Sequence, residues 1–431
     1  MTNILIINGS ILAENGWVDP GFLCIREGKI RQIGAGTPSP GQIDEAKEVL
    51  DARHCAILPG LTNAHTHLSQ TFMRGLAGGR TLIDWLKDVI WPIQAVISPE
   101  EMYLAALLGL VENLRCGAIR VTDHHKITGT PAHTNEVLKA AREVSLRFTL
   151  ARSWSDRGKN PESLENILSD FRRLFDLSRD DDHIEIANGP LALWRCSEGA
   201  LQATHQLVLE HGAFTHFHVS ESQDEVQMSL DEYDLRPVEW LETIGVLGPD
   251  TQIVHAVWVD DDEIKLIADA NAQVIHCPVS NAVLGSGVAP VAQMLGHGVD
   301  ILLGTDGPAS NDTQDIWETL KGAVNFARAT SLNPTILPPS QALKLATGGK
   351  TLRVNDPADV IVVNLDHSRV VPVQDINSAL VLGTHGSDVQ TVIVGGEILM
   401  KNGNIAIVDE KALYDECRDA IQSLRKRAEI S

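Results

Sequence analysis

The sequence has few of the features that mark secreted, membrane-spanning or nucleic-acid-binding chains. Its six cysteines are scattered over 431 residues without a Cys-x-x-Cys pair, a pattern typical of reduced thiols rather than of a disulfide framework. No apolar run approaches the roughly 18 residues of a membrane span. The N-terminal MTNILIINGSILAENG lacks the basic segment and long apolar core of a signal peptide. We therefore expect a cytoplasmic protein that does not contact a membrane.

Positive charge is also scarce. The chain has 35 Lys and Arg against 57 Asp and Glu, a formal net charge of −22. Such an acidic balance disfavours nucleic acid and anionic membrane surfaces as partners. The remaining composition, 43% hydrophobic and 21% charged, is that of a globular chain that can bury a large core. We expect a small molecule as the partner and no nucleic acid, and we leave a homo-oligomer open.

The central part of the chain alternates short apolar runs with helix-patterned segments. From residue 56 onward the runs AILPGLTNAHTH, GAIRVTDHH and LRFTLARSW begin a series of eight such units over roughly 300 residues. Near-continuous apolar strands followed by helices favour a parallel sheet buried on both faces. Eight units is the number in a (β/α)8 TIM-type barrel. The rival, a doubly wound open sheet, lacks support because no Gly-rich fingerprint follows the first strand. The sequence predicts an α/β fold with a barrel over residues 56–352.

The two ends of the chain share a different pattern. Residues 1–55 contain short strands separated by Gly turns, and ADVIVVNL and VQTVIVGGEILMKNG are strands again, the second with a Gly-Gly hairpin turn. We expect residues 1–55 and 353–431 to pair into one small β-sandwich domain, followed by an amphipathic C-terminal helix. The stretch after ALKLATGG is short, which leaves the docking of this domain open.

Histidines and carboxylates gather where the predicted barrel strands end. The first strand ends in His65-Thr66-His67, and residues i and i+2 of a strand point to the same side, so both imidazoles can reach one ion. A single His-x-His pair is weak evidence, because core histidines share this spacing. Active sites of such barrels lie at the C-terminal ends of the strands, and four later strands carry further candidates there: His218 and Glu221, His255, His276, and Asp306. Together they predict a metal site.

The candidate ligands also indicate which metal. Three neutral imidazoles and one carboxylate suit Zn²⁺ or Fe²⁺. The fourth strand, IEIANGPLA, has no Lys or Glu at its C-terminal end that would bridge a second ion. We therefore predict one Zn²⁺, with Fe²⁺ as the alternative.

Four motifs carry a resemblance to a known family. LPGLTNAHTHLSQTFMRGL, HVSES, HCPVSN and GTDGPASND resemble the amidohydrolase superfamily and, more narrowly, its ATZ/TRZ and nucleobase-deaminase branch. The resemblance covers nearly the whole chain. It implies a hydrolase acting on C–N bonds of cyclic amidines, which replaces an amino group by oxygen and releases ammonia. It implies that the metal is bound by His65, His67, His218 and Asp306. It also implies that Glu221 shuttles protons and that His255 positions the hydrolytic water. We expect His276 and Asn281 to support the site.

The substrate is less explicit in the sequence. The run His-Leu-Ser-Gln-Thr is similar to that of 8-oxoguanine deaminases in this branch, and the amide of Gln70 matches the lactam edge of an oxopurine or pterin. Trp194 could stack on a flat ring and Arg195 could donate to ring oxygens. Arg152, at the end of the third strand, is a further candidate. We predict deamination of an oxidised purine or pterin base, of the 8-oxoguanine or isoxanthopterin type.

Two other reactions remain open. Methylthioadenosine/S-adenosylhomocysteine deaminases resemble this chain but carry an acid, able to bind ribose hydroxyls, where Gln94 stands here. An s-triazine hydrolase that displaces chloride or an amine shares the fold, but the presence of Glu221 favours an amine leaving group that needs a proton. A catalytically inactive scaffold is disfavoured because every expected metal and proton-transfer residue is retained.

Overall fold

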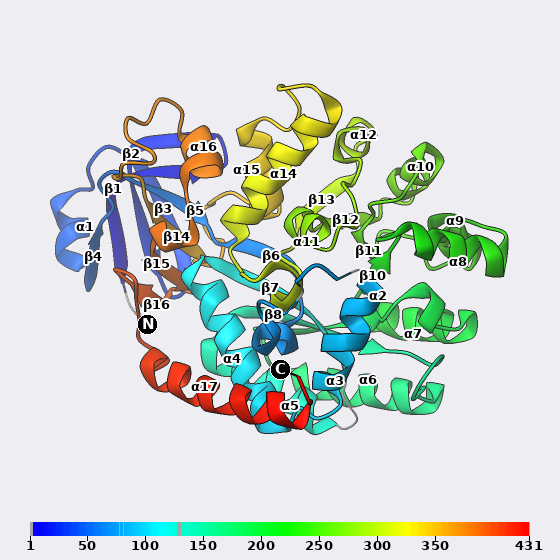
Figure 1. Cartoon of the computed structure of the whole chain (residues 1–431). Helices are drawn as coiled ribbons and strands as arrows, with labels where there is room; N and C mark the ends of the chain where they lie inside the picture. Colours follow the sequence, from blue (N-terminus) through cyan, green and yellow to red (C-terminus); the bar gives the residue numbers. More distant parts are fainter. Residues whose placement is uncertain (1–2, 77, 81, 127–130, 431) are drawn as a thin grey trace.

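The computed structural model describes residues 3–76, 78–80, 82–126 and 131–430. Their strands form two sheets, one of eight strands in the order β13-β12-β11-β10-β9-β8-β7-β6 and one of nine strands from the two chain ends. In Figure 1 the nine-stranded sheet lies to one side of the barrel and its helices. None of the described helices is long and apolar enough to cross a membrane.

The eight-stranded sheet is the predicted barrel. Its parallel strands are mostly buried because helices cover their outer face, and they are β6 (Leu61–Thr66), β7 (Ala118–His125), β8 (Arg147–Trp154), β9 (Ile184–Pro190), β10 (Thr215–Val219), β11 (Thr251–His255), β12 (Gln273–His276) and β13 (Asp300–Leu303). The backbone N–H of Asp306, just after β13, donates to the carbonyl of His65 in β6 at 3.0 Å. This contact joins the last strand to the first. The predicted (β/α)8 architecture is confirmed.

Helices follow each strand and surround the sheet (Figure 1). After β6 come η1 (Leu68–Met73), α2 (Leu82–Trp85), η2 (Leu86–Ile90), α3 (Trp91–Gln94) and α4 (Pro99–Arg115). The later barrel helices are α5 (Pro131–Val144), α6 (Leu164–Ser178), η3 (Leu193–Arg195), α7 (Glu198–Glu210), α8 (Gln223–Tyr233), α9 (Pro237–Thr243), α10 (Asp261–Asp269), α11 (Pro278–Val283), α12 (Val291–Gly296), α13 (Pro308–Asn311), α14 (Ile316–Ser331) and α15 (Pro339–Thr347). Helix α4 starts at a capping box, in which the Ser98 hydroxyl accepts from the backbone of Glu101 and the Glu101 side chain accepts from Ser98 in return.

Both ends of the chain build the second sheet, as predicted. Its strands are β1 (Ile4–Ala13), β2 (Gly16–Arg26), β3 (Lys29–Ala35), β4 (Glu48–Asp51), β5 (Cys55–Pro59), β14 (Val360–Asn364), β15 (Val389–Val394), β16 (Glu397–Lys401) and β17 (Asn404–Ile405). The antiparallel pairing of β5 with β14 connects the two ends. The helical segments of the ends are α1 (Pro40–Glu45), α16 (Ile376–Ser378), η4 (Ala379–Gly383), η5 (Gly386–Asp388) and α17 (Glu410–Arg427).

The boundary between the two sheets differs from the expected one. Residues 56–59, expected in the barrel, belong to β5 of the nine-stranded sheet, and the first barrel strand begins at Leu61. The apolar run of the sequence is continuous across this break, so periodicity does not reveal it. Gly60 marks it: a Cβ there would lie 2.2 Å from Cδ1 of Ile119 in β7. Only glycine allows the chain to pass so close to the barrel.

Charged contacts dock the β domain on the barrel. The carboxylate of Asp359, which is 4% exposed, accepts from Arg120 of β7 at 2.7 Å and from Arg147 of β8 at 2.6 Å. Helix α17 crosses back to the barrel, where Arg427 pairs with Glu101 of α4. These contacts hold the β domain against the barrel, although the stretch of chain after α15 is short.

Candidate metal centre and active site

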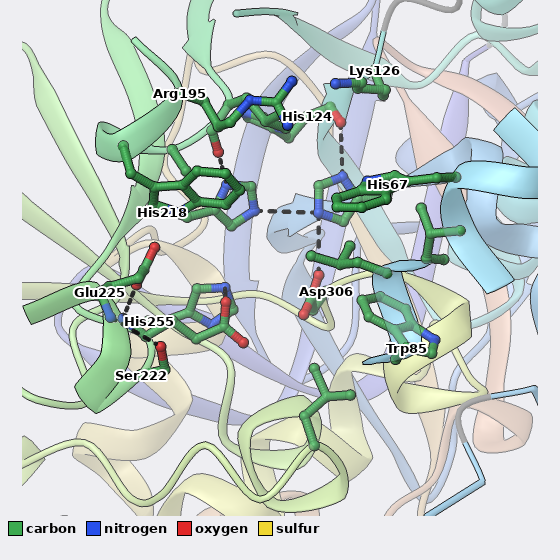
Figure 2. Close-up of a pocket in the computed structure, with 18 of the residues that line it drawn as sticks. His67, Trp85, His124, Lys126, Arg195, His218, Ser222, Glu225, His255 and Asp306 are labelled. Atoms are coloured by element: carbon green, nitrogen blue, oxygen red, sulfur yellow. Dashed lines mark hydrogen bonds and ion pairs between the residues drawn. The ribbon is translucent and has the colours of Figure 1, made fainter. Parts of the chain in front are cut away.

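Three imidazoles and one carboxylate converge at the C-terminal end of the barrel. His65 and His67 come from the end of β6 and its following residue, and His218 comes from β10; their ligand nitrogens all lie within 4.8 Å of one another. Nε2 of His67 is 3.3 Å from Nε2 of His218. Oδ1 of Asp306 is 3.4 Å from Nε2 of His65 and 3.4 Å from Nε2 of His67. Figure 2 shows His67, His218 and Asp306 pointing into one space.

Hydrogen bonds on the outer side of the rings orient this group. Nδ1 of His67 donates to the carbonyl of His124 at 2.8 Å, and Nδ1 of His218 donates to the carbonyl of Leu191 at 2.9 Å. A neutral imidazole that carries its proton on Nδ1 has a lone pair on Nε2. Burial lowers the pKa of the imidazoles of His65, His67 and His218 and keeps them neutral.

The inner side of the group fits a cation. Lone pairs and a carboxylate oxygen face one another there, an arrangement that repels itself unless a positive ion lies between them. The buried Nε2 of His65 has no hydrogen-bond partner among the described residues. Oδ2 of Asp306 is held by the hydroxyl of Ser280 at 2.5 Å and that of Ser310 at 3.1 Å. Asp306 has φ = 61°, a conformation that costs free energy and often occurs at functional sites. The donor set suits zinc.

A second acid–base pair lies beside these four groups. Nε2 of His255 is 3.6 Å from Oε2 of Glu221, and Oε1 of Glu221 accepts from the hydroxyl of Ser286 at 3.2 Å. Burial raises the pKa of Glu221 despite the opposing effect of His255. Burial alone would lower the pKa of His255, but the carboxylates of Glu221 and Asp306 outweigh it and leave the pKa raised. Both shifts favour the protonated form of the group concerned.

A further carboxyl, Glu225 in α8, supports this pair and was not predicted. Its Oε2 accepts from the backbone N–H of Glu221 at 2.7 Å. Burial, followed by the charge of Glu221, raises the pKa of Glu225 to about 7. Its position four residues after Glu221, in the first turn of a helix capped by Ser222, was the available sequence signal.

A cavity of about 120 Å³ lies over this site. Gln70, Trp194 and Arg195, the residues that the sequence predicts to contact the substrate, line it. Oε1 of Gln70 is buried and has no hydrogen-bond partner among the described residues. Gly307 leaves room for it, because a Cβ at this position would lie 1.8 Å from Oε1 of Gln70.

Other predicted residues lie outside the cavity. Arg152 does not line it; its guanidinium donates to Glu162 at 2.7 Å and to Asp170 of α6 at 2.9 Å. The side chain is therefore directed toward the surrounding helices, and the expectation that Arg152 binds substrate is wrong. His276 is buried outside the cavity, where burial and then His255 lower its pKa to about 3. Asn281, by contrast, contacts His255 directly.

Three residues that the sequence did not reveal also line the cavity: Trp85, His124 and Lys126. The ring of His124 lies 4.6 Å from that of His218, centroid to centroid. Figure 2 shows Lys126 and Arg195 on the same side of the cavity. The guanidinium of Arg195 donates to the carbonyl of Arg157 at 3.1 Å and to the hydroxyl of Ser155 at 3.3 Å. Burial and, to a smaller extent, the charge of Arg195 lower the pKa of Lys126 to about 8. The Asp-His-His at the end of β7 was a signal for His124, but Lys126 had none.

Comparison with known proteins agrees with this geometry. Residues 56–399 match the Amidohydrolase family. The chain belongs to the amidohydrolase family. A 5'-deoxyadenosine deaminase of Methanosarcina acetivorans is 34% identical over 99% of this chain and 100% of that protein. A 5-methylthioadenosine/S-adenosylhomocysteine deaminase of Syntrophomonas wolfei is 32% identical over 98% of this chain and 99% of that protein. The predicted class, a hydrolase acting on C–N bonds, is confirmed.

Solved structures of amidohydrolases show the same fold. An adenosine deaminase from Xanthomonas campestris with bound zinc superposes with a TM-score of 0.92, 25% identity and coverage of 99% of both chains. The atrazine chlorohydrolase TrzN from Arthrobacter aurescens TC1, complexed with zinc, has a TM-score of 0.90 at 24% identity over 97% of this chain and 100% of that chain. At that identity, the second likeness concerns the fold alone.

Proposed function

We propose that this amidohydrolase is a mononuclear zinc-dependent aminohydrolase that removes the amino group of a purine ring, with adenine nucleosides as its first substrates. The observation that carries the proposal is the convergence of His65, His67, His218 and Asp306 beside the Glu221–His255 pair, under one cavity. The named relatives, deaminases of 5'-deoxyadenosine and of methylthioadenosine or S-adenosylhomocysteine, support the reaction and the substrate class.

The three histidines and Asp306 would hold the zinc ion. A zinc ion bound there would supply a water molecule whose pKa lies near 7 instead of about 15.7. His255 faces the same space: Asn281 accepts from its Nδ1 at 2.9 Å, which directs Nε2 toward Glu221 and the cavity. In this arrangement His255 orients the attacking water, and Asp306 accepts its proton.

Glu221 handles the proton that the ring needs. Its raised pKa lets the carboxyl group carry a proton into the buried site. Donation of this proton to the ring nitrogen beside the attacked carbon allows the ring to accept electrons as that carbon becomes tetrahedral. Asp306 then passes the proton of the water to the amino group, which leaves as ammonia, while Glu221 recovers its proton from the hydroxyl on the attacked carbon as the carbonyl forms. Glu225 orients Glu221 by accepting from its backbone N–H.

A free oxidised purine or pterin base is the second candidate. Gln94, a neutral residue where the similar nucleoside deaminases carry an acid, lines the cavity and offers no carboxylate to the ribose hydroxyls. Gln70 lines the cavity, and an amide can match the lactam edge of such a base because it both donates and accepts. These two residues favour a base over a nucleoside, and the relatives favour the nucleoside.

Product analysis on one panel of compounds separates the candidates. The panel contains 5'-deoxyadenosine, S-adenosylhomocysteine, 8-oxoguanine, isoxanthopterin and a chloro-s-triazine, and both ammonia and chloride are measured. We expect ammonia from the adenine nucleosides. Ammonia from the oxidised bases alone would support the second candidate. Chloride release without ammonia from any compound would overturn the proposed deamination.

A further inference from the structure

A second imidazole, His216, lies directly behind the metal-facing ring of His65. Nδ1 of His65 and Nε2 of His216 are 2.8 Å apart, and both residues are fully buried. His67 and His218 donate instead to backbone carbonyls. A carbonyl oxygen can only accept, whereas each imidazole nitrogen accepts in only one of the two neutral tautomers. The orientation of His65 therefore depends on the tautomer of its neighbour.

A row of side chains on four adjacent strands continues from His216. Gln252 of β11 is paired in register with His216 of β10, and Gln273 of β12 is paired with Gln252. Asp300 of β13 is paired with Gln273. Nδ1 of His216 lies 2.7 Å from Oε1 of Gln252. Nε2 of Gln252 donates to Oε1 of Gln273 at 2.8 Å, and Nε2 of Gln273 donates to the carboxylate of Asp300. The row runs from beneath the metal centre to an exposed residue.

Metal binding by His65 determines which atom donates and which accepts in the hydrogen bonds from His65 to Gln273. If Nε2 of His65 binds the ion, its proton is on Nδ1, and Nε2 of His216 must accept. The proton of His216 is then on its Nδ1, so Gln252 must present its oxygen. The amide nitrogen of Gln252 is left to donate to Gln273.

Asp300, at the other end of the row, independently requires the same donor and acceptor roles. An ionised carboxylate only accepts, so Gln273 must present its amide nitrogen to Asp300 and its oxygen to Gln252. Both ends thus agree on the orientation of Gln252, and all four hydrogen bonds form together without a donor facing a donor. A reversed amide at Gln252 would place a donor against Nδ1–H of His216.

We propose that Gln252 is a positioning residue for the metal centre: it fixes the tautomer of His216 and, through it, holds Nε2 of His65 toward the ion. Partners of this kind orient metal-binding imidazoles, and their loss commonly weakens metal affinity or activity by about 10- to 100-fold. Here the partner acts through an intervening imidazole, from the neighbouring strand of the one that carries His216.

Two substitutions of Gln252 and one matched control test this role. Gln252→Met keeps the length of the side chain but neither accepts nor donates. Gln252→Glu still accepts from Nδ1 of His216 and loses only the hydrogen bond to Gln273, which continues to donate to Asp300. Gln273→Met makes the same chemical change one strand farther out, where Gln252 still accepts from His216. Zinc affinity is measured by competition with a chromogenic chelator, and the melting temperature of each metal-free protein is measured in parallel.

We expect Gln252→Met to bind zinc about 10- to 100-fold more weakly than the wild type, while Gln252→Glu and Gln273→Met stay within about threefold of it. The metal-free forms of the two methionine variants should melt at similar temperatures. Wild-type zinc affinity in Gln252→Met, or an equal loss in Gln252→Glu, would overturn the positioning role. The inference rests on the proposed zinc site and not on the substrate: a wild-type protein that binds no zinc fails the proposed function itself.

Discussion

Nδ1 of His255 donates a hydrogen bond to Oδ1 of Asn281 at 2.9 Å, while Nε2 on the other side of the ring lies 3.6 Å from the carboxylate of Glu221. The two contacts fix the orientation of the His255 ring, which lines the cavity, between Asn281 of α11 and Glu221 after β10. His255 has φ = 74°, so its backbone is also in a conformation that the surrounding structure must stabilise.

The first prediction concerns this contact. Asn281→Leu removes the acceptor at similar volume, so His255 loses its fixed orientation while the metal ligands stay in place. We expect kcat to fall by about 10- to 100-fold, less than the loss of a complete acid–base group, with unchanged zinc content. Asn281→Asp keeps the acceptor and is the control, expected to retain more activity. Loss of zinc in Asn281→Leu would show that the residue maintains the centre as a whole.

The second prediction concerns the metal. Purified protein should hold close to one zinc or iron ion per chain, because three imidazoles and one carboxylate form a single four-ligand site. Metal analysis should show that His67→Ala and His218→Ala lose most of it. Chelation should abolish deamination, and zinc should restore it. Two tightly held ions per chain would contradict the mononuclear centre.

The third prediction concerns proton transfer. Glu221→Gln keeps the shape of the side chain but cannot shuttle a proton, so deamination should slow by at least ~100-fold. Zinc content and the affinity for a non-reactive substrate analogue should remain. An unchanged rate would remove Glu221 from the mechanism and favour a leaving group that needs no proton, such as chloride.

The fourth prediction concerns recognition of the ring. If Gln70 and Arg195 contact the oxo edge of a bicyclic base, Arg195→Met should reduce kcat/KM for an oxopurine or pterin by roughly 10- to 200-fold. A small triazine should be affected much less. Gln94→Glu should not by itself create good nucleoside activity where none exists. This prediction tests the second candidate, the free oxidised base. Preference for adenine nucleosides, which we propose first, would remove the assignment of Gln70 and Arg195 to an oxo edge, and so would an Arg195→Met variant with wild-type kinetics on every base. Both outcomes leave the metal chemistry intact.

The fifth prediction concerns the docking of the two domains. Asp359→Asn removes the charge that pairs with Arg120 and Arg147. We expect a loss of about 2–3 kcal/mol at pH 7, below the 3–5 kcal/mol of a fully buried pair, because the two arginine side chains are 23% and 27% exposed. Urea denaturation followed by the fluorescence of the tryptophans measures it.

The pH dependence of the stability difference between wild type and Asp359→Asn is the control for this prediction. Burial alone would raise the pKa of Asp359, but the hydrogen bond from Arg147 and the nearby charges outweigh it and lower the pKa below the usual 3.8. The unfolded chain therefore binds the proton first as the pH falls, so the stabilisation is present above about pH 4 and is lost as the pH falls through the folded pKa. Wild type and Asp359→Asn should converge in stability there. A constant difference at all pH values would mean that packing, not charge, joins the domains.

The barrel and the metal ligands could be predicted because both depend on local patterns. Each apolar strand is bounded by turn residues, and the ligands follow those strands directly, so their common location at one end of the barrel follows from the topology. Glu225 and Lys126 could not be predicted in this way. They reach the cavity from a helix and from the residue after a strand. The position of Glu225 in the first turn of a capped helix is a weak signal that solvated acids share, and nothing in the spacing of Lys126 distinguishes it from a solvated charge.

Arg152 and Gly60 show two other limits of prediction from the sequence. The end position of Arg152 in β8 matches that of a substrate contact, but acids in the loop before α6 and in α6 itself pair with it on the outside of the barrel. The interruption at Gly60 lies between two apolar segments, where the Pro59-Gly60 dipeptide is a turn signal, and the close approach of Ile119 explains why glycine is needed there. His216 was recognisable in retrospect, since His216-Phe217-His218 repeats the spacing of His65-Thr66-His67.

The pairing of β5 with β14 also determines when the sheet can be completed during synthesis. Roughly 300 residues, the whole barrel, separate the two strands in the chain. At a translation rate of about 5–20 residues per second, one edge of β5 waits about 15–60 s for its partner. An unpaired strand edge is a template for association with other chains. The nascent protein is therefore most exposed to aggregation, and most in need of chaperones, while its barrel is being made.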